Sequence, residues 1–329
     1  MPSVDVAGEF ETIKRLLAPL AHPEWGRGLN DDVAVVPSRA GYDLVLTKDS
    51  IVEGVHFLAE DPMDTVAQKL LRVNLSDLAA KGAEPFGYLL GCFWSSRCGW
   101  PERKAFVAGL EADQTAFEVA LLGGDTVTTP GPASFSLTLL GWIARGRAIG
   151  RDGARPGDVV LVTGAIGDGY LGLQAARGML KLEPERLKAL IEHYRTPMPR
   201  IAFAEQVRDR ATAAIDVSDG LVADLGHLAA ASDVALEIDL GPLPVSAAGH
   251  VWLDGRVDAL DARVQLASGG DDYEIAFTAR AGDEAELHRE AARQHLRLTT
   301  IGRVVAGTGV TVRAAGAVVP VPTPGWTHR

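Results

Sequence analysis

The sequence predicts an α/β (α+β) protein of two domains, and three features carry this prediction. At 329 residues with 47% apolar content, the chain exceeds one small domain and can bury a large core. Short apolar runs typical of strands alternate with segments of helical periodicity. Residues 145–158 (RGRAIGRDGARPGD) fit neither pattern and are rich in Gly, Arg and Pro. We therefore expect domains at residues 1–148 and 149–329.

The first half predicts a mixed sheet with helices, because several of its strands lie close enough in sequence for antiparallel pairing. Helical spacing of apolar residues predicts helices at 9–20, at 64–81, where Gly82 follows, and at 101–119. Apolar runs predict strands at 33–36, 43–47, 86–94, 120–122 and 134–144.

The second half repeats the alternation of strands and helices. A strand at 159–163 precedes a Gly-rich turn and a helix at 168–180, and two helices separated by Pro197 and Pro199 follow. We expect strand, helix and strand between 213 and 240, and a further strand at 273–278.

Composition excludes several classes of protein. The net charge of −11, without any basic stripe, disfavours binding to nucleic acid or to anionic membranes. No apolar run approaches the roughly 18 residues that a membrane span needs, and the acidic N-terminus is unlike a signal peptide, so we expect a cytoplasmic protein. Two cysteines, Cys92 and Cys98, form neither a disulfide framework nor a zinc site.

Acidic clusters recur where apolar strands are predicted to end. In five places, one or two aspartates stand beside Gly, Ser, Thr or Asn, in NDDVAVV, LVLTKDS, LLGGDT, AAIDVSDG and SGGDDYE. One such cluster is an ordinary turn, since Asp and Gly are favoured there. Five at strand ends, where ligand sites gather, favour a site that holds hard cations and phosphates.

The predicted helix at 64–81 carries an acid on its apolar stripe. Val66, Leu70, Val73 and Asp77 follow one another at spacings of four, three and four residues. A carboxylate on such a stripe is costly unless it is paired or binds a metal, and no basic residue precedes it there by one turn. Asp77 is therefore a candidate metal ligand, and the alternative is a carboxylate that reaches solvent at the helix end.

Familiar phosphate-binding motifs are missing from the sequence. The dipeptide Gly-Lys never occurs, which excludes a Walker A loop, and no HRD or DFG marks a protein kinase. The segment GAIGDG at 164–169 has its glycines in the wrong order for dinucleotide binding and predicts a turn leading into a helix. Metal ions and backbone amides must then hold any phosphate.

Seven motifs, in order, resemble the thiamine-monophosphate kinase family. They are NDDVAVV, TKDSIVEGVHF, NLSDLAAKGAEP, GGDT, GRDGARPGD, AIDVSDGLVADLGH and SGGDDYEI, and they extend over most of the chain. The SDGL and GGD elements alone indicate only the wider superfamily of aminoimidazole ribonucleotide synthetase, selenophosphate synthetase and hydrogenase-maturation proteins.

The resemblance implies a two-domain aminoimidazole ribonucleotide synthetase-like fold that forms a homodimer through its N-terminal domain. It implies transfer of a phosphoryl group from ATP to thiamine monophosphate, the last step of thiamine diphosphate biosynthesis, assisted by several Mg²⁺ ions. The implied metal ligands are Asp32, Thr47, Asp49, Asp77, Asp125 and Asp216, with Asp219 on a further ion. The implied ATP contacts are Gly124, Asp125, Arg151 and Ser218, and the implied substrate contacts are His56, Asp271 and Trp326.

No general base is assigned, because the acceptor phosphate is mostly dianionic at neutral pH and has no proton to lose. The sequence departs from the family pattern at Asn30, Lys48, Lys81 and Asp271, where glycine, a small hydroxyl residue, methionine and glutamate are usual.

An alternative for His56 is a structural role without contact to the substrate. Another enzyme of the superfamily, such as aminoimidazole ribonucleotide synthetase, and a non-catalytic binder of nucleotide or thiamine phosphate are the alternatives.

The C-terminal segment VPVPTPGW predicts a stiff extended arm, because its three prolines allow neither helix nor strand. A tryptophan on a free tail adds an aggregation risk, so we expect the arm to be docked. Trp326 then either contributes a face for the cationic thiazolium ring or packs the arm onto the second domain.

Overall fold

The computed structural model describes residues 8–327, which form two compact units. The first contains the chain up to Leu78 together with Glu84–Gly146, and the second contains Ala79–Ala83 and the chain from Arg147 onward. The division after Gly146 falls inside the Gly/Arg/Pro-rich segment. The short stretch Ala79–Ala83 belongs to the second unit, although the sequence pattern placed it in the first domain.

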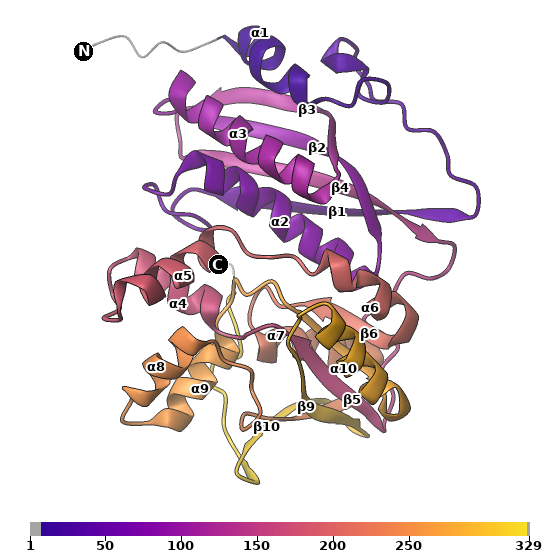
Figure 1. The fold of residues 1–329 in the computed structure, drawn as a ribbon, viewed down its shortest axis with the longest axis vertical. Coiled ribbons are helices and arrows are strands. Elements are labelled where there is room, and N and C mark those ends of the chain that lie inside the picture. The colour runs from indigo at the N-terminus through magenta and orange to yellow at the C-terminus, as the bar shows by residue number, and fades with distance from the viewer. Residues whose placement is uncertain (1–7, 328–329) are drawn as a thin grey trace. The chain divides into compact units, whose positions relative to one another are not determined.

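The first unit is a four-stranded mixed sheet in the order β1-β4-β2-β3. The β2 and β3 strands are parallel, and the other pairs are antiparallel. The helices α2 (Met63–Lys81) and α3 (Trp100–Phe117) lie across one face of the sheet (Figure 1). The strands are β1 (Tyr42–Val52), β2 (Glu84–Ser95), β3 (Ala120–Thr129) and β4 (Ser134–Ala144).

Aromatic rings fill the core between this sheet and its helices. Phe106 of α3 stacks on Phe135 of β4 with ring centroids 4.4 Å apart, and Trp94 of β2 meets both rings edge-on. All three rings are buried, and each such pair adds about 0.5–1.5 kcal/mol beyond the area that it buries. This core packs the sheet against α3.

The other face of the sheet carries large apolar side chains in contact with solvent. They alternate along β2 and β3 with buried residues and along β1 with half-buried ones, and they are 41–58% exposed: Leu44, Leu46, Leu89, Phe93 and Val127. We call this surface the outer face. A sheet that buries one face on helices usually has a polar second face, so an apolar one marks an interaction surface.

The second unit is built on a seven-stranded sheet in the order β11-β10-β7-β9-β5-β8-β6, in which only the β10–β7 pair is parallel. Its strands are β5 (Asp158–Thr163), β6 (Ala211–Asp216), β7 (Ala235–Asp239), β8 (Ile275–Arg280), β9 (Leu298–Val305), β10 (Gly309–Ala314) and β11 (Ala317–Val318). Its helices are α4 (Asp168–Ala176), α5 (Pro184–Arg195), α6 (Ala204–Arg210), α7 (Leu221–Ser232), α8 (Ala247–Asp254), α9 (Ala259–Ser268) and α10 (Glu284–Arg293).

The predicted α/β (α+β) class is confirmed, with three differences in the elements. The predicted helix at 9–20 is α1 (Glu9–Thr12) followed by a π-helical and a 3₁₀ turn, because Pro19 cannot continue an α-helix. The predicted strand at 33–36 is wrong: in the part of the chain that the structure describes, this segment forms no strand, Val33 and Val35 are exposed, and the Val35 amide donates to the Trp25 carbonyl. The predicted helix at 168–180 ends at Ala176, since Gly178 adopts a φ of 70°.

The sequence pattern missed α8–α10 and β9–β11. Within residues 8–327, none of the helices has the length and apolar content needed to cross a bilayer.

Candidate active site

The predicted site residues divide between the two units. The first unit contains Asp32, Thr47, Asp49, His56, Asp77, Gly124 and Asp125. The second contains Arg151, Asp216, Ser218, Asp219, Asp271 and Trp326.

In the first unit, the edge strand β1 and helix α2 bring three predicted residues together. The Thr47 hydroxyl donates to Asp77 Oδ2 over 2.5 Å, and the Asp49 amide donates to Asn74 Oδ1 over 3.1 Å. Asn74 is fully buried, and its own amide donates to the Leu70 carbonyl. The apolar stripe therefore directs Asn74 and Asp77, three residues apart, toward β1. Asn74 was missed as a positioning residue, although it lies inside the NLSD motif.

Asp125 lies at the opposite edge of the same sheet. A row of paired residues runs from Asp49 through Leu137 and Leu90 to Gly124, the residue before Asp125. Asp49 and Asp125 are therefore separated by three strand spacings, about 14 Å. Asp125 pairs with Gly91 and alternates with Thr126, whose hydroxyl bonds the buried Trp94 indole. Asp125 therefore belongs to the outer face, whereas Asp49 belongs to the helix face.

Asp32 lies in an exposed loop with unusual backbone geometry. Arg27, Gly28 and Leu29 have φ values of 49°, 60° and 55°. This left-handed backbone is strained at Arg27 and Leu29, which carry side chains, but not at Gly28. Arg27 pairs with Asp31, and the Asp32 amide donates to Asp31 Oδ1 over 2.8 Å. The first aspartate of the pair is thus occupied in shaping the loop, while Asp32 stays exposed.

His56 sits in a tightly bonded turn after β1. Its Nδ1 accepts from the Val52 amide over 3.1 Å, and its own amide donates to the Val52 carbonyl over 2.9 Å. The buried Lys69 of α2 donates to the His56 carbonyl over 3.0 Å. Because Nδ1 accepts, a neutral imidazole carries its proton on Nε2, which makes Nε2 a donor suited to a phosphate oxygen.

In the second unit, the SDG turn after β6 is built around one carboxylate. The amides of Ser218, Asp219 and Gly220 all donate to Oδ2 of Asp224, over 3.0, 3.1 and 3.1 Å. Burial raises the pKa of Asp224 to about 7, the nearby Asp219 carboxylate adds to the rise, and the three amides oppose it. Asp216, 6% exposed, closes β6 just before this turn. Sequence reasoning missed Asp224.

The two aspartates of SGGDDYE have different environments. Asp272 is fully buried and accepts from the Gly167 and Gly169 amides over 2.8 and 2.9 Å, at the start of α4. Burial raises its pKa well above the ordinary value, against those two donors. Asp271 adopts a φ of 69°, donates its amide to the Ser218 carbonyl and accepts from the Tyr273 hydroxyl. The predicted turn at 164–169 thus leads into α4, as expected.

A buried ion pair supports these loops from behind. Glu274, 1% exposed, binds Arg200 through both of its oxygens, with an Nε–Oε2 distance of 2.6 Å, and accepts from the Thr163 hydroxyl. Its carbonyl accepts from the Val217 amide, so it joins the SGGDDYE loop to the end of β6. Sequence reasoning missed Arg200 and Glu274, which lie 74 residues apart.

The remaining predicted residues lie at the edges of the same unit. Arg151 is exposed, and its carbonyl accepts from the Ser232 hydroxyl. The C-terminal arm is docked, since the Trp326 amide donates to the Asp219 carbonyl over 2.8 Å. Trp326 is 59% exposed, whereas a residue that only anchors the arm by packing would be largely buried.

Among the described residues, no group of three or more His, Cys, Asp or Glu side chains could hold a metal ion. The metal ligands therefore stay a prediction. Thr47, Asp49, Asp77, Asp216 and Asp219 supply only hard oxygen donors, which fit Mg²⁺ rather than a softer metal.

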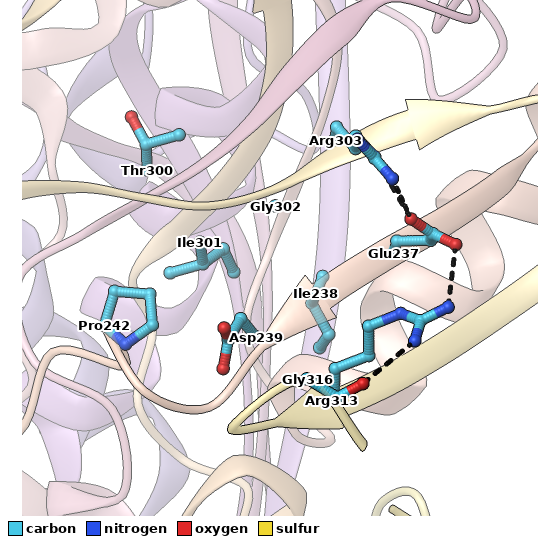
Figure 2. Close-up of a pocket in the computed structure, with 10 residues that line it drawn as sticks. All are labelled: Glu237, Ile238, Asp239, Pro242, Thr300, Ile301, Gly302, Arg303, Arg313 and Gly316. Carbon is cyan, nitrogen blue, oxygen red and sulfur yellow. Dashed lines mark hydrogen bonds and ion pairs between the residues drawn. The ribbon is translucent and has the colours of Figure 1, made fainter. Parts of the chain in front are cut away.

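Two surface cavities are lined by residues other than the predicted site residues. One of about 400 Å³ in the first unit is lined by Glu53, Asp61, Asp64 and Glu102 among others. The other, about 640 Å³ on the β7–β9–β10 face, surrounds an ion-pair network in which the Glu237 carboxylate lies between Arg303 and Arg313 (Figure 2). The hydrogen bond from Arg303, and to a lesser extent that from Arg313, lowers the pKa of Glu237. The three side chains form cross-strand ion pairs on the surface of the sheet.

Gly124 permits a close approach between β2 and β3 that leads to a testable expectation. A Cβ at Gly124 would lie 1.9 Å from the Leu90 carbonyl oxygen, and the φ of 154° disfavours L side chains. We expect Gly124→Ala to destabilise the protein by roughly 1–3 kcal/mol or more in urea unfolding. Gly123→Ala is the matched control, since its Cβ would make only a 3.4 Å contact with Leu89. Equal midpoints for the two variants would contradict this expectation.

Comparisons with known proteins identify the family of the chain. The family models for the N-terminal and C-terminal domains of AIR synthase related protein match residues 30–143 and 155–315. The thiamine-monophosphate kinase of Caulobacter vibrioides is 46% identical over 328 residues, which cover 99% of this chain and 92% of that one. The chain belongs to the thiamine-monophosphate kinase family. The predicted two-domain aminoimidazole ribonucleotide synthetase-like fold is thereby confirmed.

Solved structures of the thiamine-monophosphate kinase family share this fold. The enzyme from Stenotrophomonas maltophilia K279a superposes with a TM-score of 0.80 at 40% identity, over 88% of this chain and 91% of that one. AaThiL, complexed with AMPPCP and TMP, superposes with a TM-score of 0.77 at 31% identity, over 98% and 97% of the two chains.

Proposed function

We propose that the chain transfers the terminal phosphoryl group of ATP directly to the phosphate of thiamine monophosphate, giving ADP and thiamine diphosphate. The observation that carries this proposal is the 46% identity to a thiamine-monophosphate kinase over 99% of the chain. The related AaThiL, complexed with AMPPCP and TMP, supports the same pair of substrates.

The chain's own residues suit a transfer that needs no general base. The acceptor phosphate has no proton to lose, so the barrier is the repulsion between two anionic phosphates and their in-line alignment. The carboxylates of Asp77, Asp49 and Asp219 would hold Mg²⁺. The Thr47 hydroxyl, which contacts Asp77, would be a further oxygen ligand. Bound Mg²⁺ would neutralise phosphate charge.

The proposed substrate contacts are those that the family resemblance implies. The His56 Nε2–H would donate to the acceptor phosphate, with the ring held by the Val52 amide. Trp326 would offer its exposed ring to thiamine, and Asp271 would meet the same substrate. Gly124, Asp125, Arg151 and Ser218 would contact ATP. We also infer a cytoplasmic location, because the proposed donor ATP is made and used there.

The proposal is tested by incubating the protein with Mg²⁺ and ATP and with thiamine monophosphate, thiamine or another phosphate monoester. We expect thiamine monophosphate to be the acceptor that reacts, giving ADP and thiamine diphosphate in equal amounts, and the other two acceptors to give no product. Exhaustive chelation should abolish product formation, and added Mg²⁺ should restore it. Turnover without thiamine monophosphate, or full activity in the chelator, would overturn the proposal.

We further propose a homodimer through the outer face of the first unit. A second copy of the chain is the natural partner, since closed two-fold symmetry is the commonest oligomeric arrangement and an apolar face is self-complementary. Asp125 belongs to this face, so a two-fold contact would bring it to the interface. The exposed Leu46, Phe93 and Val127 would then be buried.

Sedimentation equilibrium at micromolar concentration tests the dimer. We expect a species of twice the 34.8 kDa chain mass for the unmodified protein. Phe93→Glu with Leu46→Glu should weaken association at least 100-fold, because two buried unpaired charges would cost several kcal/mol. Val257→Glu, at a fully exposed position of the second unit, is the control and should leave the dimer intact. A monomeric unmodified protein would contradict the proposal.

A further inference from the structure

The backbone amide of Asp219 is held by a residue of its own motif, AIDVSDGLVADLGH. Its N–H donates to the buried Asp224 carboxylate, which also accepts from the two neighbouring amides of the turn. Asp224 is 3% exposed and lies in the first turn of α7, so this side of the turn is anchored to a helix.

The carbonyl of Asp219 is held by a residue more than a hundred positions further along the chain. The Trp326 amide donates to it over 2.8 Å. Gly325 lies so close to the turn that a Cβ there would be 2.5 Å from the Ala223 side chain and 2.7 Å from the Asp219 oxygen. Only a residue without a side chain allows the arm to reach this position unchanged.

The arm that carries Trp326 is attached at its other end to the sheet. Val319, 9% exposed, donates its amide to the Val312 carbonyl of β10 over 2.8 Å. Three prolines between these attachments stiffen the arm. Trp326 therefore supplies a backbone bond to Asp219 and, as a residue that is 59% exposed, an aromatic ring at the surface beside the SDG turn.

We propose that the C-terminal arm couples the two substrate sites, so that thiamine monophosphate at the Trp326 ring and Mg·ATP at Asp219 each strengthen the binding of the other. This inference rests on the proposed function for the two ligand positions. A ligand on the ring holds the arm in place, which favours the Trp326–Asp219 hydrogen bond and fixes the SDG turn. Binding at the turn favours the same bond from the other side.

The size of the coupling follows from the bond that transmits it. A single hydrogen bond of this kind supports a coupling of about 3- to 10-fold, which corresponds to about 0.6–1.4 kcal/mol at 1.4 kcal/mol per tenfold change. Thermodynamic linkage requires the same factor in both directions. Thiamine monophosphate should thus tighten Mg·AMPPCP binding as much as Mg·AMPPCP tightens thiamine monophosphate binding.

Isothermal titration calorimetry on the full chain measures this factor without turnover. The dissociation constant of Mg·AMPPCP is measured with and without saturating thiamine monophosphate, and that of thiamine monophosphate with and without Mg·AMPPCP. We expect equal factors of about 3- to 10-fold. Two ligands that bind independently would overturn the coupling and leave the proposed function standing, whereas absent turnover in the product assay would overturn that function.

Two variants separate the arm from direct contact between the ligands. Gly325→Ala keeps the Trp326 ring but displaces its backbone from Asp219, so each ligand should still bind alone while the coupling factor falls to about one. Trp326→Ala keeps the amide but removes the ring, so thiamine monophosphate should bind several-fold more weakly with Mg·AMPPCP alone unaffected. Gly226→Ala is the matched control on α7, where an added Cβ would meet nothing within 4 Å. A folded Gly325→Ala protein that retains full coupling contradicts the proposal.

Hydrogen exchange on the unmodified protein gives a second measurement that needs no variant. We expect exchange of the amides of Val321, Thr323, Gly325 and Trp326 to slow when Mg·AMPPCP is added alone, and also when thiamine monophosphate is added alone. Protection by only one of these ligands would show that the arm does not link the sites.

Discussion

Asp77→Asn should lower kcat/KM for thiamine monophosphate at least about 100-fold without lowering stability. The substitution keeps the size of the side chain and removes the charge that would hold Mg²⁺, and interactions of this kind contribute several kcal/mol to phosphoryl transfer. Asn retains an oxygen that can accept from the Thr47 hydroxyl, so the contact between α2 and β1 is preserved. Metal-binding carboxylates are often held at a cost in stability, and removing the charge should leave Tm equal or higher.

Steady-state kinetics and thermal unfolding of the same preparation test this expectation. Asp64→Asn, an exposed acid in the first turn of α2, is the control and should leave kcat/KM unchanged. If Asp77→Asn kept near-normal turnover and lost Tm instead, Asp77 would be a structural partner of Thr47 and the metal assignment would fail.

Periodicity located the parts of the site that lie on regular elements. The buried stripe of Val66, Leu70 and Val73 positions α2, and the acid that interrupts the stripe does contact β1. The strand-end prediction holds for two of the five acidic motifs, since AAIDVSDG ends β6 and SGGDDYE leads into β8. It is wrong for the other three: Asp49 lies inside β1, Asp125 lies inside β3, and NDDVAVV lies in the loop before β1. Such features are local, because the spacing of residues along one helix or strand determines which side chains share a face.

Features that depend on tertiary contacts were beyond the sequence pattern. The tandem aspartates of SGGDDYE look alike in sequence, yet Asp272 is buried at the start of α4 while Asp271 adopts a left-handed backbone. Nothing local marks Asp224 as the acceptor of three amides. The segment at 33–36 shows the opposite error: its apolar residues resemble a strand, but among residues 8–327 it joins neither sheet.

Asp113→Ala should produce the largest loss of stability in the first unit, about 3–5 kcal/mol. Asp113 is fully buried between α2 and α3 and accepts from Arg72 Nε over 2.7 Å, from Arg72 Nη2 over 2.8 Å and from Gln68 Nε2 over 3.0 Å. Alanine removes the carboxylate that compensates the positive charge of Arg72, whose side chain is only 13% exposed. Leaving such a charge without its counter-ion costs more than the pair contributed, because both ions were already desolvated.

Urea unfolding of a matched set of variants tests this account of the α2–α3 contact. Glu111→Ala, on the exposed side of α3, should change stability by less than about 0.5 kcal/mol. The double variant Arg72→Met with Asp113→Leu replaces both ions by apolar side chains of similar size and should recover most of the loss, since hydrophobic replacement of a buried pair is often neutral. A double variant as unstable as Asp113→Ala would show that the loss comes from a packing defect, and the ion-pair explanation would then be wrong.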